Sequence, residues 1–321
     1  LSDAVNIHWG YRGYLETVLN SSQRYLSTQG QAFMFYKDKA GHVDDLTFTA
    51  GSGNPSQLVR YLLTQKGQDV VIETPLFLDL CHLQQYLLSG VEVRLVFHPA
   101  DQKIALMQAD DDANIYTIKT SDHTLFWQFV EPTPAVQLSH VQMLAENPAL
   151  YSYPKSSLKS YTIPKALSDW HLDSVFSQLP HTIHLACVLS SSFQGNKQKS
   201  PWNIQHFNIS SLSLVIENSE NITLTPDFEK GHYTTEYLAT TEQNKNGTCI
   251  SLTDFPSGFC IFTFRISSGV RRSHNNSMTP TATRLHIRFS KNLTENITVI
   301  VYGISTSMFK VDQTKNVHLM N

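Results

Sequence analysis

Much of the chain alternates apolar and polar residues with a period of two, which is the pattern of half-buried β-strands. In the second half the apolar positions are mostly β-branched or aromatic, as strands prefer. These runs are "HTIHLACVL" (181–189), "SLSLVI" (211–216), "FCIFTFRI" (259–266), "RLHIRF" (284–289) and "ITVIVY" (297–302). The first half repeats the pattern in "VEVRLVF" (91–97) and "TLFWQFV" (124–130). We therefore predict strands at all of these positions.

Two segments have helical spacing instead. In "YRGYLETVLN" (11–20) the large apolar residues recur three and four positions apart and predict one buried helix face. They are Tyr11, Tyr14, Leu15, Val18 and Leu19. "AVQLSHVQMLAEN" (135–147) shows the pattern more weakly, through Val136, Met143 and Leu144. Helices are absent between the strand-like runs of the second half, which argues against a parallel α/β sheet.

The strand-like runs are divided unevenly along the chain. The second half has about eight, separated by polar and turn-rich stretches, which favours a complete β-sandwich of the jelly-roll type. The pattern breaks around two prolines in "NPALYSYPKSS" (147–157), so we predict a first domain over 1–150 and a second over 151–321. The first domain has fewer strand-like runs, and we expect it to lack its opening strands or to receive them from a partner.

Composition narrows the possible functions. The 321 residues are 41% apolar and 16% charged, as in a folded protein. The net charge of −3 provides no basic field for nucleic acid. No apolar run approaches the roughly 20 residues that a membrane-spanning helix needs, so we expect no membrane span.

Cysteines and glycosylation sequons leave the compartment open. Cys81, Cys187, Cys249 and Cys260 form no zinc-binding spacing, and we expect mostly buried, reduced thiols. A bridge between Cys249 and Cys260 across a hairpin is the alternative. The seven N-x-Ser/Thr sequons matter only in a secreted chain. They begin at Asn20, Asn208, Asn221, Asn246, Asn275, Asn292 and Asn296.

The most site-like stretch is "NITLTPDFEKGHYTTEYLATT" (221–241). It brings together Asp227, Glu229, His232 and Glu236, which could act as an acid/base pair or hold a metal. We favour a structural interpretation, with a turn at 225–227 and Asp227 capping a short helix. That helix would bury Tyr233, Tyr237 and Leu238 and expose Glu229 and Glu236.

Other candidate motifs are incomplete. "HTIHLAC" offers His181, His184 and Cys187, but a strand would point His184 away from Cys187. "AGSGNPSQ" (50–57) lacks the lysine of a phosphate-binding loop, and the acidic turns at 40–45 and 108–114 do not form a calcium loop. Arg271 and Arg272 are an isolated basic doublet in a polar loop. We assign no catalytic, cofactor-binding or metal-binding residue, and we expect neither enzyme activity nor a cofactor.

A family resemblance appears in the order of segments along nearly the whole chain. The segments are "YRGYLETVLN", "YKDKAGHVDD", "DLCHLQQYLLSGVEVRLV", "FVEPTPAVQLSHVQML", "YPKSSLKSYTIP", "SQLPHTIHLACV", "FQGNKQKSPWNIQHFNISSLSLVI", "LTPDFEKGHYTTEYLATT", "FPSGFCIFTF" and "RLHIRFSKNLTENITVIVYG", followed by "VDQTKNV". In these the chain resembles the double-jelly-roll major capsid protein of Maverick/Polinton-type (adintovirus-like) DNA elements and their endogenised animal copies.

The resemblance implies a structural protein built of two jelly rolls side by side. It implies a homotrimer of pseudo-hexameric shape that tiles an icosahedral shell, with a minor (penton) capsid protein as a further partner. It also implies location in a virion assembled in the host nucleus or cytoplasm, without direct sequence-specific contact to nucleic acid.

Two departures from the family set up an alternative. The family has further N-terminal sequence, so we expect an N-terminally truncated or endogenised copy. Cys249, Cys260 and several sequons are not family features. The alternative is a secreted, glycosylated, lectin-like β-sandwich in which Cys249 and Cys260 are bridged.

Overall fold

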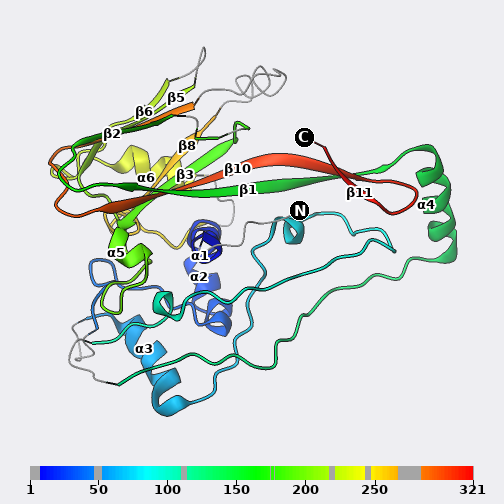
Figure 1. Cartoon of the computed structure of the whole chain (residues 1–321), viewed down its shortest axis with the longest axis horizontal. Helices are drawn as coiled ribbons and strands as arrows, with labels where there is room; N and C mark the ends of the chain where they lie inside the picture. The colour runs from blue at the N-terminus through cyan, green and yellow to red at the C-terminus, as the bar shows by residue number, and fades with distance from the viewer. Residues whose placement is uncertain are drawn as a thin grey trace.

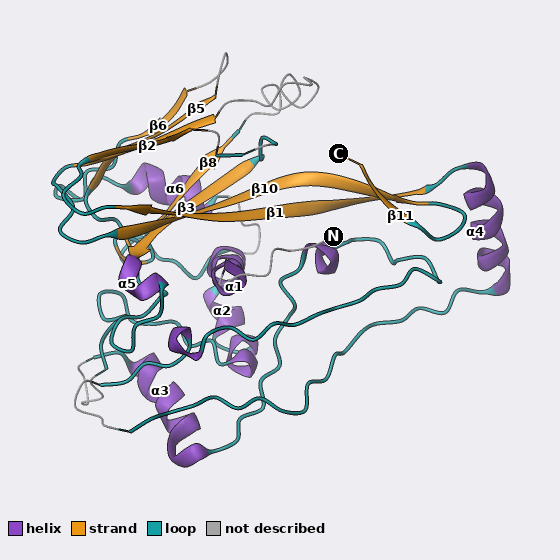
Figure 2. Ribbon diagram, in the orientation of Figure 1, coloured by secondary structure: helices purple, strands orange, loops and turns teal. Residues whose placement is uncertain are grey.

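A computed structural model describes residues 8–46, 53–109, 114–173, 175–176, 178–216, 221–242, 247–266 and 283–320. Within these ranges every strand lies at or after Ala149, and the earlier part of the chain forms helices and extended loops (Figures 1 and 2). Only short helices accompany the sheets in these ranges. The predicted all-β fold class with a few short helices is therefore confirmed.

Two antiparallel sheets form a sandwich. One contains β1 (Ala149–Ile163), β10 (Ile297–Val311), β3 (Thr182–Leu189) and β8 (Ile261–Arg265) in that order, with β11 (Val317–Met320) also paired to β10. The other contains β2 (Asp169–Asp173), β9 (Thr283–Phe289), β5 (Ile209–Ile216) and β6 (Asn221–Leu224). The two-residue strands β4 (Ile204–Gln205) and β7 (Ser257–Gly258) pair separately.

The strand order is that of a jelly roll. With β4, β7 and β11 set aside, eight strands remain in the described part of the chain, and their order is first–eighth–third–sixth in one sheet and second–seventh–fourth–fifth in the other. The first strand thus pairs with the last, the second with the seventh, the third with the sixth and the fourth with the fifth. This nested pairing is a long hairpin folded over into two sheets, which is the jelly-roll arrangement.

Burial along the strands explains why this part of the sequence folds as it does. In β9 the residues Thr283, Leu285, Ile287 and Phe289 are buried and those between them are not, as expected for a strand with one face on the core. The first seven residues of β10 are all buried, because helix α1 (His8–Asn20) contributes Tyr11, Leu15, Val18 and Leu19 to the same core. This confirms the predicted helix and its buried face.

The remaining helical elements are short and lie mainly before the sandwich. They are α2 (Gln23–Leu26), η1 (Gln29–Phe33), α3 (Pro55–Thr64), η2 (Gln65–Gly67), η3 (Asp79–His82), η4 (Gln102–Ile104), α4 (Pro134–Glu146), α5 (Ser190–Phe193) and α6 (Thr234–Thr241). The second predicted helix is thus present as α4. Between η2 and α4 runs what we call the connecting segment, residues 68–133.

The structure differs from the predicted strands at two places in this segment. Residues 91–97 and 124–130 have no regular secondary structure and belong to no sheet. A strand needs a neighbour for its backbone N–H and C=O groups, and none of the described residues pairs with these two runs. The prediction of strands at these two places was therefore wrong.

Strand β1 runs through the region predicted as a domain boundary. It is 15 residues long and contains Pro154, the residue at which the pattern breaks. The Ser156 N–H points away from β10, toward Asp79, so Pro154, two residues earlier, faces the same way. A proline is tolerated there because its missing N–H lies on the outer edge of the sheet. The division into domains 1–150 and 151–321 remains a prediction.

Candidate functional site: an apolar surface and the polar network behind it

Two acidic residues of 221–241 form ion pairs with surface lysines. Asp227 pairs with Lys230 at 2.8 Å, and its backbone forms reciprocal hydrogen bonds with His232 at 2.9 and 2.8 Å. Glu229 pairs with Lys291 at 2.6 Å. The hydrogen bonds from Lys230 hold the pKa of the Asp227 carboxyl below its ordinary value, as in an exposed turn. The structural interpretation of this stretch fits these contacts.

Two details of that interpretation were wrong. Helix α6 begins at Thr234, so Asp227 does not cap it. Because the helix begins later than predicted, a different face of it is buried. Glu236 is 4% exposed, whereas Leu238 is 45% exposed. Tyr233 and Tyr237 do pack against the core, and the Tyr237 hydroxyl donates to the Ile250 carbonyl at 3.2 Å.

His184 and three of the four cysteines are buried, whereas His181 is half-buried. His184 lies on β3, stacks on Tyr302 and forms a 2.9 Å hydrogen bond with Thr263, and burial lowers its pKa to about 3. Cys187, Cys249 and Cys260 are buried and Cys81 is exposed, and none of the four forms a disulfide. Reduced thiols were predicted, and the alternative bridge between Cys249 and Cys260 is absent. In the described ranges no group of three or more His, Cys, Asp or Glu side chains could hold a metal.

The other candidate motifs add no site. In the turn at 40–45, Asp44 accepts hydrogen bonds from the Ser200 N–H and the Asn203 side chain, both at 2.7 Å, so it joins two parts of the fold. Most of 108–114, the start of 50–57, and Arg271 and Arg272 lie outside the described residues.

The connecting segment carries an unusual number of exposed apolar side chains. Val71 is 94% exposed, Ile115 89% and Phe129 87%. The others are Ile72, Tyr86, Val93, Val96, Phe97, Tyr116, Ile118, Leu125, Phe126, Trp127 and Val130. Single exposed apolar residues are normal on a protein, whereas a contiguous patch of them is typical of an interaction site.

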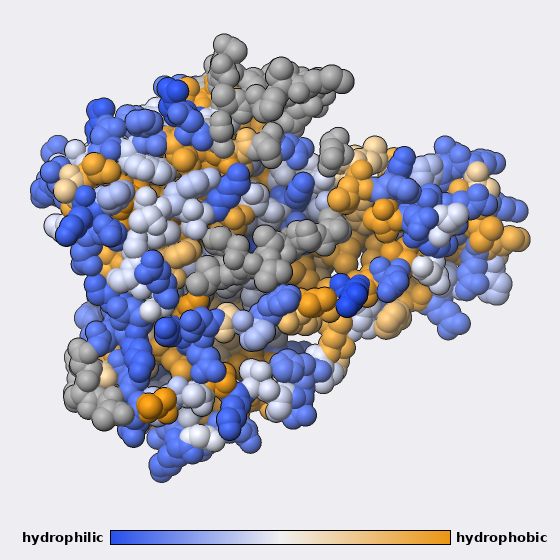
Figure 3. All heavy atoms as spheres, viewed as in Figure 1, coloured by the Kyte–Doolittle hydropathy of each residue, from blue (hydrophilic) through white to orange (hydrophobic). Residues whose placement is uncertain are grey.

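The series continues onto the elements at the far end of β1 and β10. Helix α4 exposes Val136, Leu138, Val141 and Met143 and buries only Leu144 among its large apolar residues. Strand β11 exposes Val317, Leu319 and Met320. Figure 3 shows apolar residues on the visible surface of the part of the molecule that extends toward α4. We call this set, together with the exposed residues of the connecting segment, the apolar surface.

One part of the connecting segment is anchored to the long strands. Tyr151 and Tyr153 of β1 and Phe309 and Val311 of β10 form a second, small core, separate from that of the sandwich. Leu83, Leu87, Leu88 and Val91 of the connecting segment pack against it. The Tyr151 hydroxyl also donates to the Tyr86 carbonyl at 3.2 Å and accepts from the Leu88 N–H at 3.1 Å.

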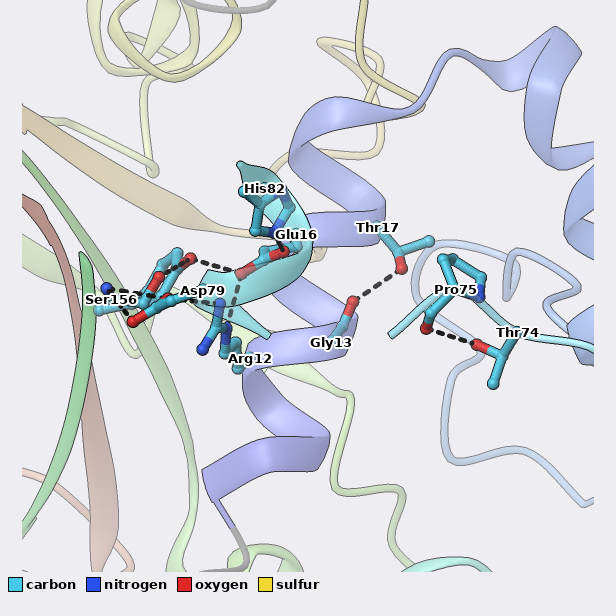
Figure 4. A network of polar contacts seen from close by, with 10 residues as sticks. Arg12, Gly13, Glu16, Thr17, Thr74, Pro75, Asp79, His82 and Ser156 are labelled. Carbon is cyan, nitrogen blue, oxygen red and sulfur yellow. Dashed lines mark hydrogen bonds and ion pairs between the residues drawn. The ribbon is translucent and has the colours of Figure 1, made fainter. Parts of the chain in front are cut away.

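A buried polar network makes a second anchor, at η3 (Figure 4). The Arg12 guanidinium donates to Glu16 at 2.8 Å and to Asp79 at 2.7 Å. Asp79 also accepts the Ser156 N–H with both carboxylate oxygens, each at 3.2 Å. The carboxylate of Asp79 therefore takes the place of a neighbouring strand at the edge of β1 and ties η3 to the sheet.

Glu16 is the centre of this polar network. Its Oε1 accepts the Tyr302 hydroxyl at 2.8 Å, and its Oε2 lies 3.1 Å from His82 Nε2. Burial alone would raise the pKa of Glu16, but His82 and Arg12 outweigh burial and lower it. The hydrogen bond to Glu16 raises the pKa of His82 in turn. Burial raises the pKa of Tyr302, which keeps its proton.

Sequence reasoning did not find this network. Its members come from α1, η3, β1 and β10, which are far apart along the chain. The one local signal is the spacing of Arg12 and Glu16, four residues apart on the helix, which brings them together on one side. Nothing in the sequence indicates that this side faces Asp79 and His82.

The strand order and these contacts define a jelly-roll protein that carries a large apolar surface and a buried polar anchor. Among solved structures it is similar to the mavirus major capsid protein, with a TM-score of 0.33 and 11% identity over 53% of this chain and 41% of that one. For the Sputnik virophage structure the TM-score is 0.33, with 10% identity over 52% of this chain and 38% of that one. For the PBCV-1 virus capsid the values are 0.34, 9%, 57% and 55%.

This chain covers less than two thirds of the length of each of these three chains. No family model matches the sequence, and no curated protein does. The likenesses are distant, so the jelly-roll assignment rests on the strand order. Among the described residues no helix is long and apolar enough to cross a membrane.

Proposed function

We propose that the protein is a major capsid subunit that associates with copies of itself. In detail, we propose a homotrimer of pseudo-hexameric outline that tiles the icosahedral shell of a Maverick/Polinton-type virus or element, with a penton protein as a further partner. The assembled form would be a virion component. The proposed role is structural, and it depends on the shape of the subunit and on the burial of apolar area between subunits.

The observation that carries the proposal is the apolar surface. Phe126, which is 78% exposed, and Phe129 contribute stabilising free energy only when another protein surface covers them. Covering apolar area contributes roughly 25 cal/mol per Å², and large, apolar interfaces are typical of permanent assemblies. A second copy of the chain presents the same kind of surface, which suits a symmetric oligomer.

The strand-like runs of the connecting segment add support. Residues 91–97 and 124–130 alternate in sequence as strands do, and they have no neighbouring strand in the described part of the chain. Sheet pairing with another chain would satisfy their backbone groups, as in β-strand addition. The proposal thus accounts for both the exposed side chains and the unpaired strand pattern.

Light scattering coupled to size-exclusion chromatography tests the proposal. We expect the full chain to elute as a trimer and the variant Phe129→Lys to shift toward monomer, because a charge in a covered apolar contact is costly. The exposed position of Phe129 means that the monomer itself loses little. Leu252→Lys is the matched control, since Leu252 is exposed outside the apolar surface.

A wild-type chain that stays monomeric at every concentration would overturn the proposal. The proposal would also be overturned if the Phe129→Lys and Leu252→Lys variants both had the same oligomeric state as the wild type. Electron microscopy of the concentrated protein supplies a second readout, in which hexagonal arrays or shells are the expected result.

A further inference from the structure

Strand β11 is a regular strand whose side chains are all exposed. None of its four residues is buried, and neither core of the described residues includes one of them. Val317, Leu319 and Met320 are apolar, so their contact with water is unfavourable. Burial of side chains therefore does not explain why β11 is held in place. It is held by its pairing with the last residues of β10 and by the turn that joins the two strands.

That turn is organised by one carboxylate. Asp312 accepts hydrogen bonds from the Thr314 N–H at 2.8 Å, the Thr314 hydroxyl at 2.7 Å and the Asn316 N–H at 3.0 Å. Its second oxygen lies 2.8 Å from His318 Nε2. The hydrogen bonds from Thr314 and His318 hold the pKa of the Asp312 carboxyl well below its ordinary value. The turn thus fixes the position of β11 beside β10 without a hydrophobic core.

The outer edge of β11 presents main-chain groups to its surroundings. The Asp312 N–H donates to the Asn316 carbonyl at 3.1 Å, which makes these two residues a hydrogen-bonded pair of the β10–β11 ladder. Such pairs alternate along an antiparallel ladder, so Val317 and Leu319 belong to the pairs between them. The N–H and C=O groups of Val317 and Leu319 therefore point away from β10. Over the described ranges no strand pairs with this edge.

The sequence of β11 does not discourage pairing with another strand. Natural sheet edges are often protected by charged side chains or by proline. Strand β2, at an edge of the other sheet, contains Asp169 and Asp173, and the outer edge of β1 is bonded by Asp79. The sequence of β11, Val-His-Leu-Met, contains no acidic residue, lysine, arginine or proline. An apolar edge of this kind is suited to strand addition.

The chain itself contains a run that matches this edge. Residues 124–130, "TLFWQFV", alternate as strands do and contain neither a charged residue nor a proline, which is typical of segments that pair readily as strands. Their apolar side chains are exposed. The other strand-like run, 91–97, is less suitable, because it includes Glu92 and Arg94 and because Val91 already packs on the small core.

We propose that β11 is the docking edge for residues 124–130 of a second copy of the chain. The run adds as a strand and bonds to the main-chain groups of Val317 and Leu319, and its aromatic side chains cover the apolar side chains of β11. The edge and the run are different parts of the chain, so the copies join head to tail, which closes into a ring when the rotation allows. This inference rests on the proposed self-association and names the contact that produces it.

Removal of one outward N–H tests the docking edge. Leu319→Pro removes that N–H and leaves the ladder to β10 in place, as for other prolines at sheet edges. Leu319→Ala is the matched control, because it loses the side chain and keeps the N–H. Light scattering of the full chain over a range of concentrations measures self-association. We expect its Kd to be higher in Leu319→Pro than in Leu319→Ala by about tenfold or more, because a main-chain hydrogen bond is lost and its acceptor is left unpaired.

Hydrogen exchange read by mass spectrometry identifies the partner strand in the wild type, without any variant. In the assembled protein, peptides that cover 124–130 and β11 should both be protected. Both should lose protection when the protein is diluted to the monomer, since the pairing is between copies. In Leu319→Pro the two peptides should exchange fast together, whereas the peptide that covers β1 should keep its wild-type protection.

Two results would overturn the inference and leave the proposed function standing. One is a wild-type assembly in which 124–130 exchanges as fast as in the monomer. The other is an assembly with the same Kd in Leu319→Pro and in Leu319→Ala. A wild-type chain that stays monomeric at every concentration would instead overturn the proposed function, and the docking edge with it.

Discussion

At the residue scale, the stretch 221–241 shows how one helix start decides which side chains matter. Sequence reasoning identified Tyr233 and Tyr237 as packing residues, and both pack on the core. It placed Glu236 outside and Leu238 inside, and the structure reverses these two. The reason is that the start of a short helix depends on tertiary contacts, such as the Tyr237 bond to Ile250, which local patterns do not contain.

We therefore predict that Tyr237→Ala destabilises the protein much more than Asp227→Ala. The Tyr237→Ala variant loses the packing against Phe255 and the hydrogen bond to the Ile250 carbonyl. A large-to-small change of this kind in a core typically lowers the free energy of unfolding by about 2–4 kcal/mol. Asp227→Ala removes an exposed pair with Lys230 and the hydrogen bond from the Lys230 N–H, and exposed contacts of this kind contribute little to stability. Urea unfolding of both variants measures the free energies, and equal losses would contradict the packing interpretation.

At the element scale, α1 is held to the sheet by two different kinds of contact. Its apolar side joins the main core, as the helical spacing predicted. Its polar side, at Arg12 and Glu16, meets η3 and β10, and no pattern in the sequence predicted that meeting. Apolar periodicity reveals which face is buried, but buried ion pairs depend on where distant segments cross.

Asp79 connects these elements, and Asp79→Ala should be strongly destabilising. The change removes a carboxylate with which Arg12 pairs and takes away the acceptor at the β1 edge. Breaking a buried pair from one side costs about 3–5 kcal/mol. Asp173→Ala is the control, because Asp173 pairs with Arg284 on the surface, and urea unfolding compares the two. A loss no larger than that of the control would mean that the pair at Asp79 contributes little.

At the scale of the whole molecule, two hydrophobic cores share the same pair of strands. The main core uses the first half of β10 and the small core uses its last residues, Phe309 and Val311. Period-two patterns predicted most sandwich strands, but the polar, proline-containing β1 was missed, because half of its length lies outside the sandwich. The partner of the apolar surface cannot be read from one chain at all.

Because the strands are continuous, we predict that both cores unfold in one transition. Phe309→Ala, a change at a residue 2% exposed, should lower the midpoint of the entire calorimetric transition, with a loss of about 3–5 kcal/mol. Leu252→Ala, at an exposed position outside the apolar surface, should leave it nearly unchanged. Two separate transitions, of which only one moves in Phe309→Ala, would show that the cores are independent.

The ladder between β1 and β10 also has a mechanical consequence. All fifteen residues of β1 face partners on β10 in one unbroken register, from Ala149 opposite Val311 to Ile163 opposite Ile297. A force that separates the two strands at the end near α4 acts on one residue pair at a time, so the pairs break one after another. A pull that slides one strand along the other loads all the pairs together. The β1–β10 ladder is therefore compliant to forces that separate its two strands at the end near α4 and stiff to forces along its length.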